Sequence, residues 1–228
     1  MIASNRWTRF IAAALVAGGA LLSPTAFAQP EQELVERARR TLDNFVKDPD
    51  MRWLRENAGQ THAILIVPEM LKLGVVIGGA AGTGVAFRRD AQTGQWGGPV
   101  FFTLAAGSFG LQLGAQVSEV LLLMMNERGA RQLLANSFKL GPDASVAAGP
   151  VGVGTSVAPI SDIVSFSRSQ GLFAGISLEG TILSPRDEWN NAYYGSGVRV
   201  EDVFAGRKVA PKGSTVRAEV QKAMHGPK

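Results

Sequence analysis

The sequence predicts an α+β fold, in which a curved, largely antiparallel and barrel-like sheet is joined to an N-terminal helical hairpin and peripheral helices. Residues 31–60 place apolar side chains at helical spacing. From residue 74 onward, most segments are short apolar or alternating runs, which is the pattern of strands. The chain has 27 glycines among 228 residues, above the usual share of about 7%. Glycines inside strands favour a sharply curved sheet over a flat one.

The first 28 residues are typical of a secretory signal peptide. Arg6 and Arg9 precede an apolar stretch at residues 10–22, and residues 26–28 read Ala-Phe-Ala, a small-x-small cleavage site. The apolar stretch has 13 residues, whereas a membrane anchor needs roughly 20. We therefore expect cleavage after Ala28 and a periplasmic or secreted protein, peripherally associated with the cell envelope.

A helical hairpin is predicted next. Residues 31–47 form an amphipathic helix, and Asp48 and Pro49 then supply the N-cap and first-turn proline of a second short helix that ends at Gly59. Basic and acidic residues are nearly balanced here, so the polar face is expected to be solvated. We expect the first helix to pack on the sheet; the alternative is that it lies on a bilayer through Leu34, Leu42 and Phe45.

Strands dominate the rest of the chain. Ala63–Val67 predicts a strand that Pro68 closes, followed by one helical turn at residues 69–73. Residues 94–97 predict a hairpin tip and residues 127–136 a helix. The further strands are expected at residues 75–77, 85–89, 100–104, 111–123, 147–153, 163–167 and 172–183.

The glycine-rich segment 73–87 has three interpretations. Its spacing gives neither G-x-G-x-x-G nor a Walker lysine, which argues against a phosphate loop. Glycines at every fourth position, Gly74, Gly78 and Gly82, fit a membrane glycine zipper, but the uncharged run has only 15 residues. Bends and close-packing points in a curved sheet are the favoured interpretation.

The formal net charge of +4 does not arise in the predicted domain. Residues 1–28 contribute +2 and residues 205–228 contribute +5, which leaves −3 for residues 29–204. A slightly acidic domain argues against a nucleic-acid-binding protein. We expect a single domain at 29–204, followed by a basic, mobile tail at 205–228 with a short helix at residues 214–224.

The residues that catalysis or metal binding would need are scarce. The chain has two histidines, His62 and His225, and no cysteine, which excludes thiolate metal sites and disulfides. Residues 175–180 approach a G-x-S-x-G motif but contain one residue too many. We therefore expect no enzyme, metal or cofactor; a lipid hydrolase that uses Ser177 or Glu179 is the enzymatic alternative.

One block of the sequence points to a family. Residues 165–180 read Ser-Phe-Ser-Arg-Ser-Gln-Gly-Leu-Phe-Ala-Gly-Ile-Ser-Leu-Glu-Gly and resemble the signature of the SYLF-domain family. Further pieces agree in order, from about residue 37 to residue 204: Ile66-Val67-Pro68, Gly78-Gly79, Gly82-x-Gly84, Trp96 with Pro99, Gly110 with Gln112 and Gly114, Gly149-Pro150 and Tyr193-Tyr194-Gly195. This chain has Phe166 where the family often has Tyr, and Gln170 where it often has Lys.

The resemblance implies a non-enzymatic module that binds phospholipid, with phosphoinositides preferred by eukaryotic members, some of which bind actin. For an exported bacterial protein, phosphatidic acid, phosphatidylglycerol or cardiolipin is the more natural anionic lipid. Headgroups need cations and acyl chains need apolar surface, so the candidate lipid-binding residues near the motif blocks are Lys72, Arg88, Arg89, Arg168, Trp96 and Phe173. The alternatives are a solvated hairpin end for the paired arginines and core packing for the aromatic residues.

A second functional hypothesis remains open beside lipid binding. The protein would then be a glycine-zipper envelope protein that inserts or oligomerises through residues 73–87 and 109–125. The oligomeric state is left open by both hypotheses.

Overall fold

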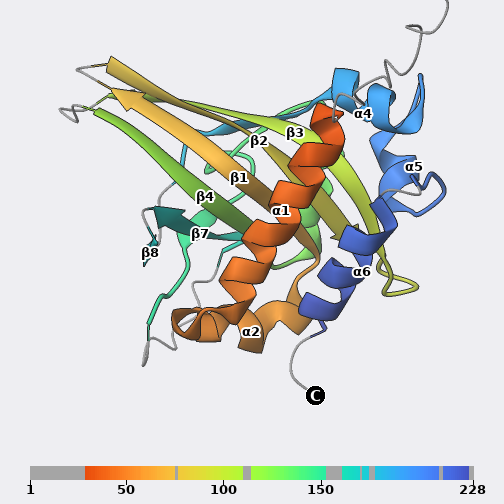
Figure 1. Cartoon of the computed structure of the whole chain (residues 1–228), viewed down its shortest axis with the longest axis horizontal. Helices are drawn as coiled ribbons and strands as arrows, with labels where there is room; N and C mark the ends of the chain where they lie inside the picture. The colour runs from red at the N-terminus through yellow and green to blue at the C-terminus, as the bar shows by residue number, and fades with distance from the viewer. Residues whose placement is uncertain are drawn as a thin grey trace, which may run out of the picture.

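The computed structural model describes residues 29–74, 77–109, 114–152, 161–169, 171–174, 178–210 and 213–225 (Figure 1). The expected signal peptide, residues 1–28, lies outside them. The helices are α1 (Pro30–Lys47), α2 (Arg52–Asn57), α3 (Glu127–Gln132), α4 (Asp187–Tyr194), α5 (Val200–Phe204) and α6 (Ser214–Ala223). The strands are β1 (Ala63–Gly74), β2 (Ile77–Arg89), β3 (Trp96–Phe109), β4 (Gly114–Met124), β5 (Phe138–Lys139), β6 (Val146–Ala148), β7 (Ile163–Ser169), β8 (Leu172–Ala174) and β9 (Ile182–Pro185).

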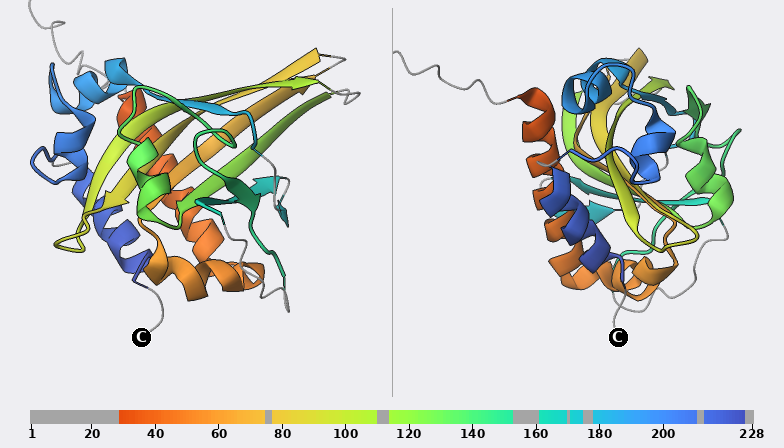
Figure 2. Two further views of the ribbon diagram at one scale, coloured as in Figure 1. Left: turned by 180° about the vertical axis from the view of Figure 1, so that it is seen from behind. Right: turned by 90° about the vertical axis from the view of Figure 1, so that its right-hand side faces the viewer.

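One mixed sheet organises the described chain. Its strand order is β5-β9-β3-β2-β1-β4-β7-β6, and β8 pairs with β7. The pairs are antiparallel apart from β6 with β7. The sheet curls, with α1, α2 and α6 on one side and α3 and α5 on the other (Figure 2). The predicted α+β class and the curved, largely antiparallel sheet are therefore confirmed.

The N-terminal helical hairpin also forms as predicted. α1 begins at Pro30, carries Glu31 and Glu33 in its first turn and Lys47 in its last, an arrangement that suits the helix dipole. The Asp48 side chain accepts a hydrogen bond of 2.9 Å from the backbone N of Asp50 and caps the 3₁₀ turn that leads into α2.

Several predicted strand boundaries are wrong. β1 does not end at Pro68: it continues to Gly74, and the expected helical turn at residues 69–73 is strand. A register shift between Ile66 and Glu69 absorbs the proline, because a bulge tolerates a residue without an N–H group. The expected strand at 172–183 is interrupted between β8 and β9, and Gly180 has a φ of 84°. The helix expected at 127–136 ends at Gln132.

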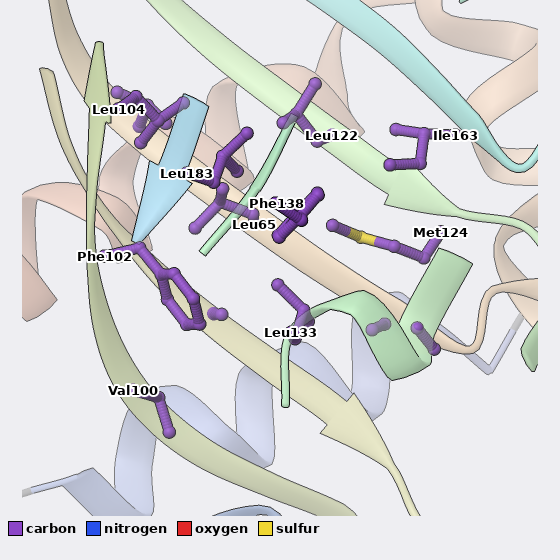
Figure 3. Packing of buried hydrophobic residues seen from close by; sticks show 14 of the residues in the cluster. Leu65, Val100, Phe102, Leu104, Leu122, Met124, Leu133, Phe138, Ile163 and Leu183 are labelled. Atoms are coloured by element: carbon purple, nitrogen blue, oxygen red, sulfur yellow. The ribbon is translucent and has the colours of Figure 1, made fainter. Parts of the chain in front are cut away.

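Alternating side chains divide the apolar residues into two clusters. Leu65 and Val67 of β1 point to the inner side of the curled sheet, and Ile64 and Ile66 point to the outer side. The inner cluster joins buried residues of β1, β2, β3, β4, β5, β7 and β9 with Leu133, and Figure 3 shows part of this packing. The outer cluster lies beneath α1, α2 and α6.

The C-terminal residues are part of this outer cluster. Val216 and Val220 are 0% exposed and Met224 is 1% exposed. The prediction of a mobile tail is therefore wrong for residues 213–225, because the apolar face of α6 packs against the domain.

Two glycines of β2 allow this strand to pass close to the backbone of β1. A Cβ atom on Gly82 would lie 2.8 Å from the Glu69 carbonyl oxygen, and one on Gly84 would lie 2.9 Å from that of Ile66. Both distances are too short for a side chain, so these glycines are close-packing points at the bulge of β1, as the favoured interpretation holds.

Candidate functional site

A hollow between α1, α2 and α6 combines cations with apolar surface. We call it the basic groove; its volume is about 640 Å³ and it is lined by Arg39, Leu42, Asp43, Val46, Lys47, Arg55, Glu219, Lys222 and Ala223. Its four basic and two acidic side chains give it a net positive charge. A hollow of this size, with a few polar groups around apolar surface, is typical of small-molecule and lipid sites.

Helical spacing brings these side chains together. Arg39, Asp43 and Lys47 are four residues apart along α1 and therefore share one face of the helix. Leu42 lies beside them and is 3% exposed, so it forms an apolar floor. α6 packs alongside and places Lys222 on the opposite wall.

Exposed ion pairs neutralise part of the positive charge of the basic groove. Lys47 Nζ lies 2.8 Å from Asp43, and Arg39 lies 3.1 Å from Glu36 and 3.6 Å from Glu219. The hydrogen bond to Glu36 and the nearby charge of Glu219 raise the pKa of Arg39, which keeps its guanidinium charged. Exposed pairs of this kind contribute little to stability, so an anionic ligand can replace the acidic partners at small cost.

The remaining two cations have different roles. Arg55 donates to the backbone carbonyls of Val46 at 3.2 Å, of Asp48, and of Pro49 at 3.1 Å. It therefore satisfies carbonyl groups at the C-terminal end of α1. The Lys222 side chain is exposed and makes no hydrogen bond or ion pair with any residue that the structure describes. Lys47 and Lys222 are thus the cations best placed to meet a ligand.

The predicted arginines of the β2–β3 hairpin are engaged by the protein itself. Arg88 is 19% exposed and its guanidinium lies 2.5 Å from Glu127. Arg89 donates to the carbonyl oxygens of Gly59 at 3.1 Å and Gly94 at 3.3 Å. Trp96 faces Arg89 across the strand pair, yet it is only 4% exposed and belongs to the outer cluster.

The other predicted residues lie elsewhere on the sheet. Arg168 on β7 is opposite Phe173 on β8, and its guanidinium lies 3.2 Å from Glu119. Glu119 also accepts a 2.7 Å hydrogen bond from Thr41 of α1, so this group ties α1 to the sheet. Lys72 is exposed on β1. The six predicted residues therefore occupy three separate places and share no site among the described residues.

The basic groove was not predicted from the sequence because the residues that line it are far apart in the chain. α1 was expected to present a solvated polar face, and Lys222 belonged to a segment expected to be a tail. The available signal was the amphipathic pattern of Val216, Val220 and Met224, which indicates a helix with one packed face.

The family-like block contributes chiefly to packing in its described part. Phe166 is fully buried and its ring centroid lies 5.9 Å from that of Trp53. A Cβ atom on Gly149 would lie 2.2 Å from the Phe166 ring. Ser165 Oγ donates to the Ala147 carbonyl at 3.1 Å. These contacts account for glycine and an aromatic residue at these two positions.

The described residues contain neither a metal cluster nor a helix that could span a membrane. Within the described ranges, no group of three His, Asp or Glu side chains is arranged to hold a metal ion. No helix of the described chain combines the length and the apolar character needed to cross a membrane. The described parts of segments 73–87 and 109–125 are β-strands up to Met124, so their glycines do not form a helical zipper there.

Comparison with known proteins places the chain in a family. A family model described as Ysc84, Las17-binding protein actin regulator, matches residues 105–223. Protein YSC84 of Saccharomyces cerevisiae is 30% identical over 188 residues, which cover 77% of this chain and 40% of the yeast protein. The SH3 domain-containing YSC84-like protein 1 of Bos taurus is 29% identical over 152 residues, which cover 64% of this chain and 44% of the bovine protein.

This chain spans less than half the length of these curated relatives. The family description names binding and regulation rather than catalysis. The matched region includes the block at 165–180 and ends at the last residue of α6. By this match over more than half of its length, the chain belongs to the Ysc84 family, which is the SYLF-domain family that residues 165–180 resemble.

Proposed function

We propose that this protein is an exported, non-enzymatic module that binds anionic phospholipid at the cell envelope, and that the basic groove is the binding site. The observation that carries the proposal is the pairing of Lys47 and Lys222 on facing helices above an apolar floor. A phospholipid headgroup needs this combination, because its phosphate is anionic and the adjoining glycerol and acyl carbons are apolar.

The charges of the groove support a lipid ligand. A lysine near an anionic membrane surface contributes roughly 1 kcal/mol of attraction. Lys47 and Lys222 together therefore supply about 2 kcal/mol, which suits reversible, peripheral association rather than a permanent anchor. Leu42, Val46 and Ala223 line the same hollow and offer contact to the first carbons of an acyl chain.

The family names raise a protein ligand as the alternative. Las17 binding and actin regulation are the printed description of the family model, and the named relatives are more than twice as long as the shared region. We propose lipid rather than protein for this chain because its expected export places it away from actin, and because the groove pairs cations with a narrow apolar floor.

Vesicle co-sedimentation tests the proposal. Residues 29–228 contain every residue of both core clusters and are mixed at low salt with phosphatidylglycerol and cardiolipin vesicles, or with phosphatidylcholine vesicles as the neutral control. Binding to the anionic vesicles alone is expected, weakening as salt screens the charges. Absence of binding to anionic vesicles at low salt would overturn the proposal.

A matched pair of variants locates the site. Lys222→Glu is expected to weaken binding to anionic vesicles about thirtyfold, since a lost attraction and a new repulsion of roughly 1 kcal/mol each add up. Lys208→Glu makes the same charge change at an exposed residue outside the groove and is expected to weaken binding by less than about fivefold. Equal losses in the two variants would exclude the groove as the site.

A further inference from the structure

The outer face of the sheet continues beyond α1 without a helix over it in the described chain (Figures 1 and 2). Four large apolar side chains are exposed there: Leu71 at 38%, Leu73 at 50%, Val117 at 51% and Ile182 at 47%. The residues between them are small and also exposed. We call this surface the distal face; it consists of Leu71, Leu73, Ala81, Ala105, Ala115, Val117 and Ile182.

Strand register places these residues side by side. Leu71 is opposite Ala81 on one side and Val117 on the other, and Leu73 is opposite Ala115. Directly opposed residues of an antiparallel pair point to the same face. That face is the one that α1 covers further along, because Glu69, two residues before Leu71, pairs with Arg37 of α1 at 2.5 Å.

The strand ends that carry the distal face have few charged side chains. Among the described residues at 70–74, 77–83, 103–109 and 114–118, Lys72 is the one charged side chain. The residues that join β1 to β2 and β3 to β4, at 75–76 and 110–113, read Val-Val and Gly-Leu-Gln-Leu and are uncharged in the sequence. These ranges therefore offer apolar side chains and one cation, and Lys139 of β5, which is exposed opposite Ile182, adds a second cation beside the distal face.

Among the described residues, side chains on both faces of the strand ends are exposed. Lys72 and Gln116 are opposite each other and exposed, and they point to the face away from Leu71, Leu73 and Val117. A folded partner docked on the outer face would leave this second face in water. A medium that surrounds the strand ends meets both faces, and a bilayer interface accommodates leucines in hydrocarbon and a lysine at the phosphates.

We infer that this end of the sheet inserts into the interfacial region of an anionic bilayer, with Leu71, Leu73 and Val117 among the acyl chains and Lys72 at the lipid phosphates. The inference rests on the proposed function in taking a bilayer as the ligand. The distal face adjoins the N-terminal half of α1, and the basic groove lies along its C-terminal half, so the two surfaces can be tested independently.

The absence of cysteine from the chain permits a site-specific probe. Leu73→Cys in residues 29–228 is labelled with the environment-sensitive dye NBD and mixed with phosphatidylglycerol vesicles. A severalfold rise in emission, a blue shift and quenching by doxyl-labelled lipid are expected. The control is Gln92→Cys, an exposed position in the turn that joins β2 and β3, where no change is expected.

The outcomes separate this inference from the proposed function. Vesicles that pellet the protein without altering the dye at residue 73 would overturn the inference and leave lipid binding intact. Vesicles that do not pellet the protein would overturn the proposed function as well. A dye response that rises with protein concentration in the absence of vesicles would assign the distal face to a second copy of the chain, and would also overturn the inference.

Two variants add a test that does not depend on the dye. The double variant Leu73→Asp and Val117→Asp is expected to reduce vesicle binding at least tenfold, with the thermal unfolding midpoint unchanged because both side chains are half exposed. Lys72→Gln is expected to reduce binding about fivefold, the equivalent of one interfacial lysine. Unchanged binding in the double variant would overturn the inference.

Discussion

Val220 provides a quantitative test of whether the basic C-terminal segment is part of the folded domain. Its side chain is 0% exposed and packs in the outer cluster with Val216 and Met224. Val220→Ala removes two carbons, each worth about 0.8 kcal/mol of transfer free energy. The cavity left behind raises the loss to about 2.5 kcal/mol, and the higher helix propensity of alanine returns about 0.5 kcal/mol.

The expected result is therefore a decrease of about 2 kcal/mol in the free energy of unfolding. Urea unfolding of residues 29–228, followed by circular dichroism and by tryptophan fluorescence, measures it. Val209→Ala is the matched control, because Val209 is 45% exposed and its truncation should change the free energy by less than about 0.5 kcal/mol. An equally small effect for Val220→Ala would refute the packing of α6 and restore the tail that the sequence suggested.

Two further predictions concern the fold. Burial alone raises the pKa of Asp162, but hydrogen bonds from Asn126 and Ser145 outweigh it and hold the pKa below its usual value. The free energy of unfolding of the wild type should therefore exceed that of Asp162→Asn by about 1–3 kcal/mol at neutral pH. Urea titrations should show this difference vanishing as the pH falls below 3.8 and the carboxylate is protonated. Gly149→Ala should cost about 1–3 kcal/mol by urea unfolding, because its Cβ would overlap Phe166, whereas Gly107→Ala, which meets nothing within 4 Å, should be nearly neutral; equal effects would contradict the packing.

Local patterns were sufficient for the elements that local chemistry defines. α1 follows from its apolar periodicity and Pro30, and the turn into α2 follows from Asp48 as a capping residue. The curved sheet follows from glycines such as Gly82 and Gly84, which have no room for a side chain. In each case, the determining residues lie within a few positions of one another in the chain.

The errors arise where tertiary contacts override a local signal. Pro68 usually ends a strand, but β1 continues past it because a bulge opposite Gly82 and Gly84 accommodates the proline. The charges of the C-terminal segment suggested a solvated tail, but Val216 and Val220 pack against apolar side chains of α1 and β3. No local pattern shows whether such a surface exists.

In the candidate site, too, local sequence was a poor guide where contacts between distant residues decide the outcome. Arg88 and Arg168 are near the motif blocks, but Glu127 of α3 and Glu119 of β4 pair with them, and those partners are 39 and 49 residues away in the chain. Lys47 and Lys222 gave no sequence signal as a pair, because only the packing of α6 against α1 brings them to one groove. Sequence therefore predicted the family, the lipid ligand stays a proposal, and the structure supplied the proposed location.

The most direct test of the central proposal is the affinity for phosphatidylglycerol vesicles of two double variants with the same net charge. Lys47→Glu with Lys222→Glu reverses both groove lysines, and Arg131→Glu with Lys208→Glu reverses two exposed basic side chains outside the groove and the distal face. We expect the groove variant to bind about a thousandfold more weakly than wild type, since each reversal costs roughly 2 kcal/mol, and the control variant to stay within about twenty-five-fold of it. Equal affinities for the two variants would contradict the proposed site, and wild-type protein that fails to bind would contradict lipid binding itself.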